Sequence, residues 1–188
     1  MGKRGQCRGH IGVLHDREDG AAAVELAVVL PLLVMMIFGI ISFGFIFHDK
    51  LSLSDGAREA ARFGATLPVT NFASSGVPME EWLDVIAARA VADATGSLDP
   101  GVPNRTICVA YVHPDGTAGV DSTKRRTEIG TSIAYANVPC FDDGRPNDER
   151  RVQVQLGRDI DFVVILASRT ISLSAESVTR FEASLVSS

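Results

Sequence analysis

The most constraining feature of this 188-residue chain is an apolar run near its N-terminus. Residues 26–47 read LAVVLPLLVMMIFGIISFGFIF, which is 22 positions without one charged side chain. At a rise of about 1.5 Å per residue, a helix of this length measures roughly 33 Å and matches a bilayer core about 30 Å thick. A secretory signal has a shorter apolar region of about 7–15 residues that ends in small residues, whereas bulky aromatics close this run. The sequence therefore predicts a single transmembrane helix.

The residues that flank the run indicate its orientation. Four Lys or Arg residues precede the run and three follow it within about twenty residues, so the positive-inside rule favours a cytoplasmic N-terminus. Cys108 and Cys140 are the only cysteines after the run, and a pair suits an oxidising compartment. If they bond, the closed loop of about thirty residues adds roughly 3–4 kcal/mol of stability. Two free thiols are the alternative.

Composition and motif spacing exclude several function classes. A net charge of −5 offers no basic field for a phosphate backbone, so we expect no nucleic-acid partner. The cysteines and histidines lack zinc-binding spacing, and the acidic segment 142–149 lacks the EF-hand order, so we expect no metal and a solvated turn there. His48 and His113 lie near aspartates but have no nucleophile in a recognisable setting, and no phosphate-binding glycine loop is present. We expect neither an enzyme nor a cofactor.

Two helices are expected. The first runs from Ala21 to about Ala65, because helix-forming residues continue beyond the apolar run until Pro68, with Gly56 as a candidate hinge. In its second half, four residues fall along one apolar stripe: Leu51, Ala57, Ala61 and Ala65. The second helix covers residues 79–95 after Pro78, and its Trp82 is expected to pack in a core.

Beyond residue 103 the hydrophobic period changes from helical to alternating. Strands are predicted near residues 107–112, 152–156, 162–166 and 171–175, in an antiparallel sheet of three to five strands. Residues 113–150 are rich in Gly, Asp, Thr and Asn, and we expect a long exposed excursion there, with one short strand near 132–138 and a tether at Cys140. Within it, the basic run Lys124–Arg126 reads as a solvated loop.

The residues around the start of the apolar run resemble a known family. A hydrophilic leader ends at Gly20, and AAAVE then leads into the apolar helix, which is the order seen in the processing region of type IV prepilins. The stretch GAAAVELAVVLPLL over residues 20–33, with AREAARFGA over residues 57–65, resembles the TadE-like family of tight-adherence (Tad) pilus assembly proteins, which are pseudopilins or minor pilins. The segment ISLSAESVTRFE over residues 171–182 is similar to the strand that closes such proteins.

The resemblance implies roles for three residues. Cleavage after Gly20 by a membrane aspartyl prepilin peptidase would leave Ala21 as the mature N-terminus. Glu25 would then pair with the free N-terminal amine of a neighbouring subunit, since a carboxylate in a low-dielectric setting needs a cationic partner. The alternatives are an unprocessed single-span anchor, and a Glu25 that lies among the lipid headgroups at the start of the helix.

The expected fold class is α+β: a long N-terminal transmembrane helix followed by a small exported domain with one helix packed on an antiparallel sheet, as in pilins. The expected parts are a cytoplasmic leader (1–20), the transmembrane helix and helical stalk (21–66) and an extracytoplasmic domain (67–188). The implied function is a non-enzymatic component of Tad-type (type IVb) pilus biogenesis in the bacterial inner membrane, with other pilus subunits, the Tad assembly machinery and prepilin peptidase as partners. The alternative is a membrane-anchored exported binding domain that contacts cell-envelope or secreted partners.

Overall fold

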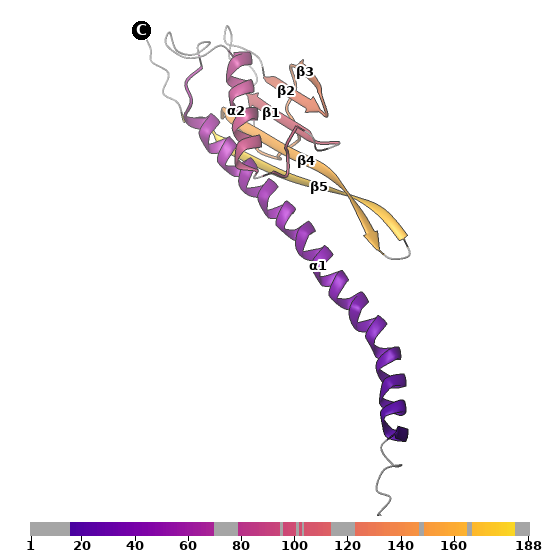
Figure 1. The fold of residues 1–188 in the computed structure, drawn as a ribbon. Coiled ribbons are helices and arrows are strands. Elements are labelled where there is room, and N and C mark those ends of the chain that lie inside the picture. The colour runs from indigo at the N-terminus through magenta and orange to yellow at the C-terminus, as the bar shows by residue number, and fades with distance from the viewer. Residues whose placement is uncertain are drawn as a thin grey trace, which may run out of the picture. The chain divides into compact units, whose positions relative to one another are not determined.

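The computed structural model describes residues 16–69, 79–94, 96–100, 102, 104–113, 123–146, 149–164 and 167–182. Within these ranges the chain forms two helices followed by five strands (Figure 1). The elements are α1 (Asp16–Thr66), α2 (Met79–Asp93), β1 (Thr106–Val112), β2 (Lys124–Ile129), β3 (Ser132–Ala136), β4 (Arg151–Val164) and β5 (Ala167–Arg180). The strands form one antiparallel sheet in the order β3-β2-β1-β4-β5. The predicted α+β fold is confirmed.

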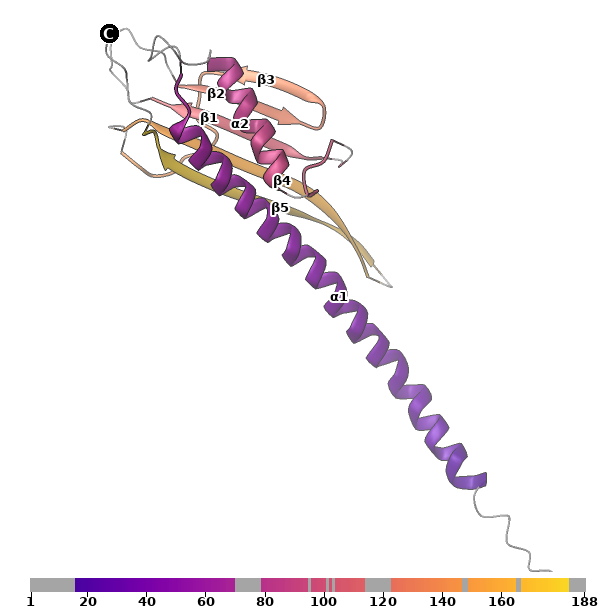
Figure 2. The same ribbon diagram turned by 60° about the vertical axis from the view of Figure 1, so that its left-hand side comes forward.

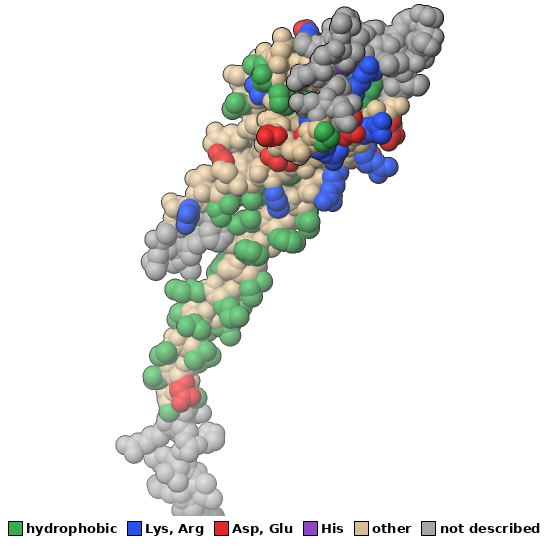
Figure 3. Space-filling model, turned by 180° about the vertical axis from the view of Figure 1, so that it is seen from behind, with side chains coloured by type: hydrophobic (Ala, Val, Ile, Leu, Met, Phe, Trp, Pro, Cys, Tyr) green, Lys and Arg blue, Asp and Glu red, His purple; other side chains and the backbone are tan. Residues whose placement is uncertain are grey.

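The chain divides into two compact units between Phe43 and Gly44, and helix α1 is continuous through that point. The first unit carries most of the apolar run, and most of the large hydrophobic side chains described there are exposed; Figure 3 shows them along the helix. An 18-residue window of this helix reaches a mean hydropathy of 2.8, and none of it is buried within the chain. Since the helix is long and apolar enough to cross a bilayer, it fits a single-pass membrane anchor.

The second unit has one core, between the helices and one face of the sheet. The part of α1 that belongs to this unit and the whole of α2 lie over that face (Figure 2). Trp82 of α2 is fully buried, as predicted, and its ring meets Tyr111 of β1 edge-on at 5.9 Å between centroids. Its indole N–H donates to the Leu67 carbonyl at 3.0 Å, so the tryptophan joins α2 to the chain just after α1.

The buried stripe of α1 differs in one position from the prediction. Ala57, Ala61 and Ala65 are buried as expected, but Leu51 is 49% exposed and Leu53 is buried instead. Two residues correspond to about 200° around a helix of 3.6 residues per turn, so these leucines lie on opposite sides of α1. The stripe is therefore centred on Leu53 and the alanines.

Glycines let the two helices and the sheet approach each other closely. A Cβ atom added at Gly56 would lie 3.1 Å from both the carbonyl oxygen of Ala90 and the Cβ of Ala94. At Gly64 it would lie 2.5 Å from the Cδ1 atom of Ile86 in the core. α1 remains helical through Gly56, so this residue serves as a contact point for α2 and the helix has no break there.

The region expected as an excursion contains two strands. The predicted short strand near residues 132–138 is present as β3, but β2 was not predicted, and it includes the basic run Lys124–Arg126. The interpretation of that run as a solvated loop is wrong, because Arg126 is buried. β2 lacks the apolar alternation that reveals a strand, since its buried positions are occupied by charged side chains.

The strand predicted at residues 162–166 is not a separate element. Residues 162–164 form the end of β4, whereas residues 165–166 lie outside the described residues. β1 pairs with β4 only as far as Gly157, so beyond this glycine β4 and β5 continue together as a two-stranded ribbon. The ribbon consists of residues 158–164 and 167–173.

Candidate functional site

The residues expected to be processed lie on one exposed stretch of α1. Gly20, Ala21 and Glu25 are all exposed. A Cβ atom at Gly20 would meet nothing within 4 Å, so packing within the described chain does not require a glycine there. Glu25 has no hydrogen-bond or ion-pair partner among the residues that the structure describes, which leaves its carboxylate available to another molecule.

Two charged residues that follow the apolar run make contacts inside the second unit. Asp49 and Lys50 are the first charged residues after the run. One Asp49 carboxylate oxygen lies 3.3 Å from the Arg158 guanidinium of β4, and the other accepts a hydrogen bond from the Ser97 hydroxyl at 3.2 Å. Lys50 donates to the Ser174 carbonyl of β5. The residues that leave the apolar run are thereby held to the start of the ribbon.

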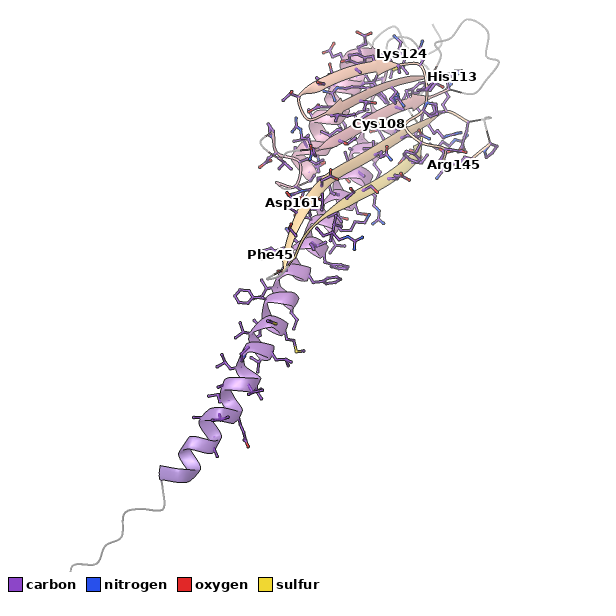
Figure 4. The ribbon with its side chains drawn as sticks, turned by 90° about the vertical axis from the view of Figure 1, so that its right-hand side faces the viewer. Phe45, Cys108, His113, Lys124, Arg145 and Asp161 are labelled. Atoms are coloured by element: carbon purple, nitrogen blue, oxygen red, sulfur yellow. A yellow bond between two sulfur atoms is a disulfide. The ribbon has the colours of Figure 1, made fainter. Side chains whose placement is uncertain are left out.

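Residues 137–146, which we call the strap, lie against part of the sheet face that points away from the helices, over β1 and the start of β4. Cys140 of the strap is joined by a disulfide to Cys108 of β1, with 5.9 Å between the Cα atoms. This is the pair that the sequence indicated. Figure 4 shows Cys108 and Arg145 on this side of the sheet. Because the strap covers this face, β1 is buried on both sides along most of its length.

A fully buried glutamine holds the strap in place beside the disulfide. The Gln153 side-chain oxygen accepts from the Cys140 backbone N–H at 3.0 Å. Its amide nitrogen donates to the Phe141 carbonyl at 3.0 Å and to the Asp143 carboxylate at 2.9 Å. All of these are hydrogen bonds of ordinary length, so the polar group of Gln153 is satisfied inside the domain.

The acidic turn predicted to be solvated is partly buried. The Asp143 side chain is 4% exposed, and its carboxylate lies 2.7 Å from the Arg151 guanidinium, itself 5% exposed. Burial alone would raise the pKa of Asp143, but hydrogen bonds from Gln153 and the Arg145 backbone, with the charge of Arg151, lower it below the ordinary value. The interpretation of this aspartate as solvated is wrong, because the sequence does not show that Arg151 of β4 lies directly beside it under the strap.

This carboxylate predicts a specific pH dependence. Since the pKa of Asp143 is lower in the folded state than its ordinary value of about 3.9, the stability it contributes is present above that pH and is lost as the pH falls further. Asp143→Asn should lower the free energy of unfolding at pH 7 by about 1.5–3 kcal/mol, because a charged hydrogen-bond partner of Arg151 is removed.

The difference between wild type and Asp143→Asn should shrink when unfolding is measured below about pH 4. Asp142→Asn is the matched control, since Asp142 is exposed and keeps an oxygen that can accept from the Gly144 N–H. A difference that stays constant from pH 7 to pH 3 would contradict the assignment of the charged pair.

Beside the strap lies an open hollow of about 340 Å³. Its lining includes His113, Phe141, Asp142, Arg145 and Arg151. Among the described residues, no group of three or more His, Cys, Asp or Glu side chains is arranged to hold a metal ion.

A second polar cluster joins α2 to the edge of the sheet. The Arg126 guanidinium lies 2.6 Å from the Asp84 carboxylate of α2 and 2.8 Å from Glu128. Glu128 also pairs with Arg105, and Tyr135 of β3 donates to Asp84 at 3.0 Å. Burial alone would lower the pKa of Arg126, but hydrogen bonds to Glu128 and Asp84 and their negative charges raise it, so the arginine stays charged.

One segment of the chain is similar to a known protein family. A family model described as TadE-like protein matches residues 20–62. No curated protein and no solved structure matches the chain. The matched segment begins at Gly20, includes Glu25 and the whole apolar run, and ends in the part of α1 that packs against the domain. The resemblance expected from the sequence is thus confirmed for this segment: residues 20–62 are similar to the TadE-like family.

Proposed function

We propose that this chain is a non-enzymatic component of Tad pilus biogenesis, a minor pilin or pseudopilin that is anchored in the inner membrane by α1. The observation that carries the proposal is the coincidence of the TadE-like match with the exposed apolar helix. The N-terminus would lie in the cytoplasm and residues 67–188 outside the membrane. The disulfide between Cys108 and Cys140 supports this orientation, because such bonds persist in oxidising compartments.

The proposal includes processing of the leader 1–20. Cleavage by a prepilin peptidase between Gly20 and Ala21 would create a free amine five residues before the apolar run begins at Leu26. A positive charge at the N-terminus of a helix is unfavourable next to the helix dipole, so the new amine needs a negative partner. Glu25 of a neighbouring subunit offers one, since its carboxylate is exposed and has no partner among the described residues.

Mass spectrometry of the mature N-terminus tests the processing step. We expect the membrane-bound chain to begin at Ala21 in cells that contain the Tad machinery. Gly20→Leu should leave the folded domain intact, because nothing packs against Gly20 in the described chain, while the leader stays attached. An intact leader on the wild-type chain would contradict processing and would favour the alternative, a membrane-anchored binding domain.

Replacement of the carboxylate tests the role of Glu25. Glu25→Gln keeps the side-chain shape and removes the charge, so we expect pilus-dependent adherence to fall while membrane insertion persists. Glu81→Gln is the control, because Glu81 is an exposed carboxylate on α2 outside the TadE-like segment. If the Glu25 variant adheres as well as the wild type, Glu25 makes no subunit contact and lies only among the lipid headgroups.

A further inference from the structure

The part of α1 that belongs to the second unit carries a group of charged residues on its exposed side. Four exposed side chains form this group, which we call the charged face: Asp55, Arg58, Glu59 and Arg62. At 3.6 residues per turn, they lie within about 100° of the helix circumference. The buried stripe of α1 occupies the other side and packs in the core. The charged face therefore takes no part in the packing of the second unit.

The charges of this face are not neutralised within the described chain. None of the four side chains has an ion-pair or hydrogen-bond partner among the residues that the structure describes. Asp55 does not pair with Arg58, although the two are three residues apart on the helix. Glu59 likewise does not pair with Arg62. All four charges are thus available to another molecule.

The charges are arranged in two lines along α1. Asp55 and Glu59 are four residues apart and form an acidic line. Arg58 and Arg62 are also four residues apart and form a basic line beside it. Like charges at this spacing repel each other, so the arrangement is unfavourable for an isolated helix. It becomes favourable when a partner places a basic line against the acidic one and an acidic line against the basic one.

We propose that the charged face is the contact surface for a second copy of this chain, with the two α1 helices parallel. When two copies face each other across a two-fold axis that runs along α1, each acidic line lies opposite the basic line of the other copy. An axis across the helices would make them antiparallel and would place acidic against acidic and basic against basic. The charged face is therefore complementary to itself only in the parallel arrangement.

The same charges determine the register of the pair. Glu59 and Arg58 are adjacent in the sequence and differ by about 1.5 Å in height along the helix. In the parallel pair, Glu59 of each copy faces Arg58 of the other, so this ion pair forms twice. Leu51, which is 49% exposed, lies seven residues before Arg58 on the same side of α1 and would be covered as well.

Exposed ion pairs add little affinity, so the charged face mainly determines the direction and register of the contact. The inference concerns the second unit alone. It holds whether or not the leader is cleaved and whether or not the chain acts in pilus assembly.

Cysteine cross-linking of the full-length chain tests the proposal. The chain is expressed without other Tad proteins, and Cys7→Ser removes the one thiol outside the disulfide. Thr66→Cys places a thiol at the exposed end of α1. In isolated membranes, a short bis-maleimide should convert most of this variant into a product of twice the chain mass. Ser132→Cys, at an exposed position of β3, should give several-fold less of that product.

A second cysteine position distinguishes the two directions. In the parallel pair, residue 66 of one copy lies beside residue 66 of the other, and the same holds for residue 51. In an antiparallel pair centred on the charged face, residue 66 lies beside residue 51. Chains with Thr66→Cys and chains with Leu51→Cys, tagged to differ in mass, are therefore expressed together. We expect each to cross-link to its own kind, and a predominant mixed product would contradict the parallel arrangement.

Exchange of charges tests the complementarity. Asp55→Arg with Glu59→Arg makes the face entirely basic, and Arg58→Glu with Arg62→Glu makes it entirely acidic. Each double variant alone should give about fivefold less cross-linking through Thr66→Cys, because like charges then meet across the contact. When the two variants are expressed together, cross-linking should recover as a mixed product.

The control for charge reversal is Glu81→Arg on the exposed face of α2, which should leave the cross-linking unchanged. All variants should keep the melting temperature of the wild type to within a few degrees, since only exposed side chains are replaced. Cross-linking at residue 66 that does not exceed that at residue 132 would overturn the proposal. A yield that ignores the charge changes, or that does not recover when the two variants are mixed, would do the same.

Discussion

Replacing Cys108 and Cys140 together by alanine should lower the free energy of unfolding of the second unit by about 3–4 kcal/mol. The disulfide closes a loop with a sequence separation of 32, and the expected magnitude follows from the chain entropy that this cross-link removes from the unfolded state. The melting temperature should fall by about 10 °C or more for a domain of this size. Fluorescence of Trp82, the only tryptophan, reports the transition from within the core.

Reduction provides the control for this variant. A reductant should lower the melting temperature of the wild type by a similar amount and leave the double variant unchanged. The variant should still fold, because Gln153 and the pair between Asp143 and Arg151 also hold the strap. A wild type that unfolds at the same temperature with and without reductant would show that the strap does not depend on the disulfide.

Glu128→Gln should lower the free energy of unfolding by about 3–5 kcal/mol, because removing one partner of a buried ion pair leaves the other charge uncompensated. Glu128 faces two arginines, Arg105 and Arg126, and its side chain is only 9% exposed. Denaturant titration followed by Trp82 fluorescence measures the change.

The matched variant for this experiment is Glu81→Gln, which removes a carboxylate from the exposed face of α2. Its effect should stay within about 0.5 kcal/mol, as for most surface substitutions. Equal effects of the two variants would contradict the role of Glu128 as the centre of a buried cluster.

The sequence predicted the elements whose buried positions are occupied by apolar residues. The length of the apolar run predicted a long helix, and Trp82 indicated the buried face of α2. β1 and the first part of β4 show the expected apolar residues, because these central strands pack directly against the helices. The antiparallel sheet and its range of three to five strands follow from these segments, and the structure has five.

The sequence did not predict β2 or the burial of Asp143, and both omissions have the same physical cause. β2 places Arg126 and Glu128 on the face that packs toward α2, so buried ion pairs replace the apolar residues that reveal a strand. Asp143 appears in the sequence as one of several acidic turn residues, and only the fold shows that Arg151 faces it. Hydrophobic periodicity cannot detect such pairs, because each member on its own is a typical surface residue.

The candidate site could be predicted to a similar extent. The TadE-like segment could be recognised because its pattern is local in sequence and lies on one helix, whereas the roles of Gly20 and Glu25 stay predictions. The cysteine pair was indicated by count and position. The strap itself could not be predicted, since it is held by Gln153, a polar residue of β4 that alternation assigns to the solvent face. The link between the ribbon and the end of the apolar run likewise depends on contacts between distant residues, Asp49 with Arg158 and Lys50 with Ser174.

The central claim is that α1 holds the chain in the membrane with the sheet domain on the far side from the cytoplasm. Alkaline phosphatase fused to the C-terminus tests it directly, because this enzyme requires disulfides and becomes active only outside the cytoplasm. The account predicts an active fusion that sediments with the membranes and is released only by detergent. A fusion that is inactive, or that stays in the soluble fraction without detergent, would contradict it.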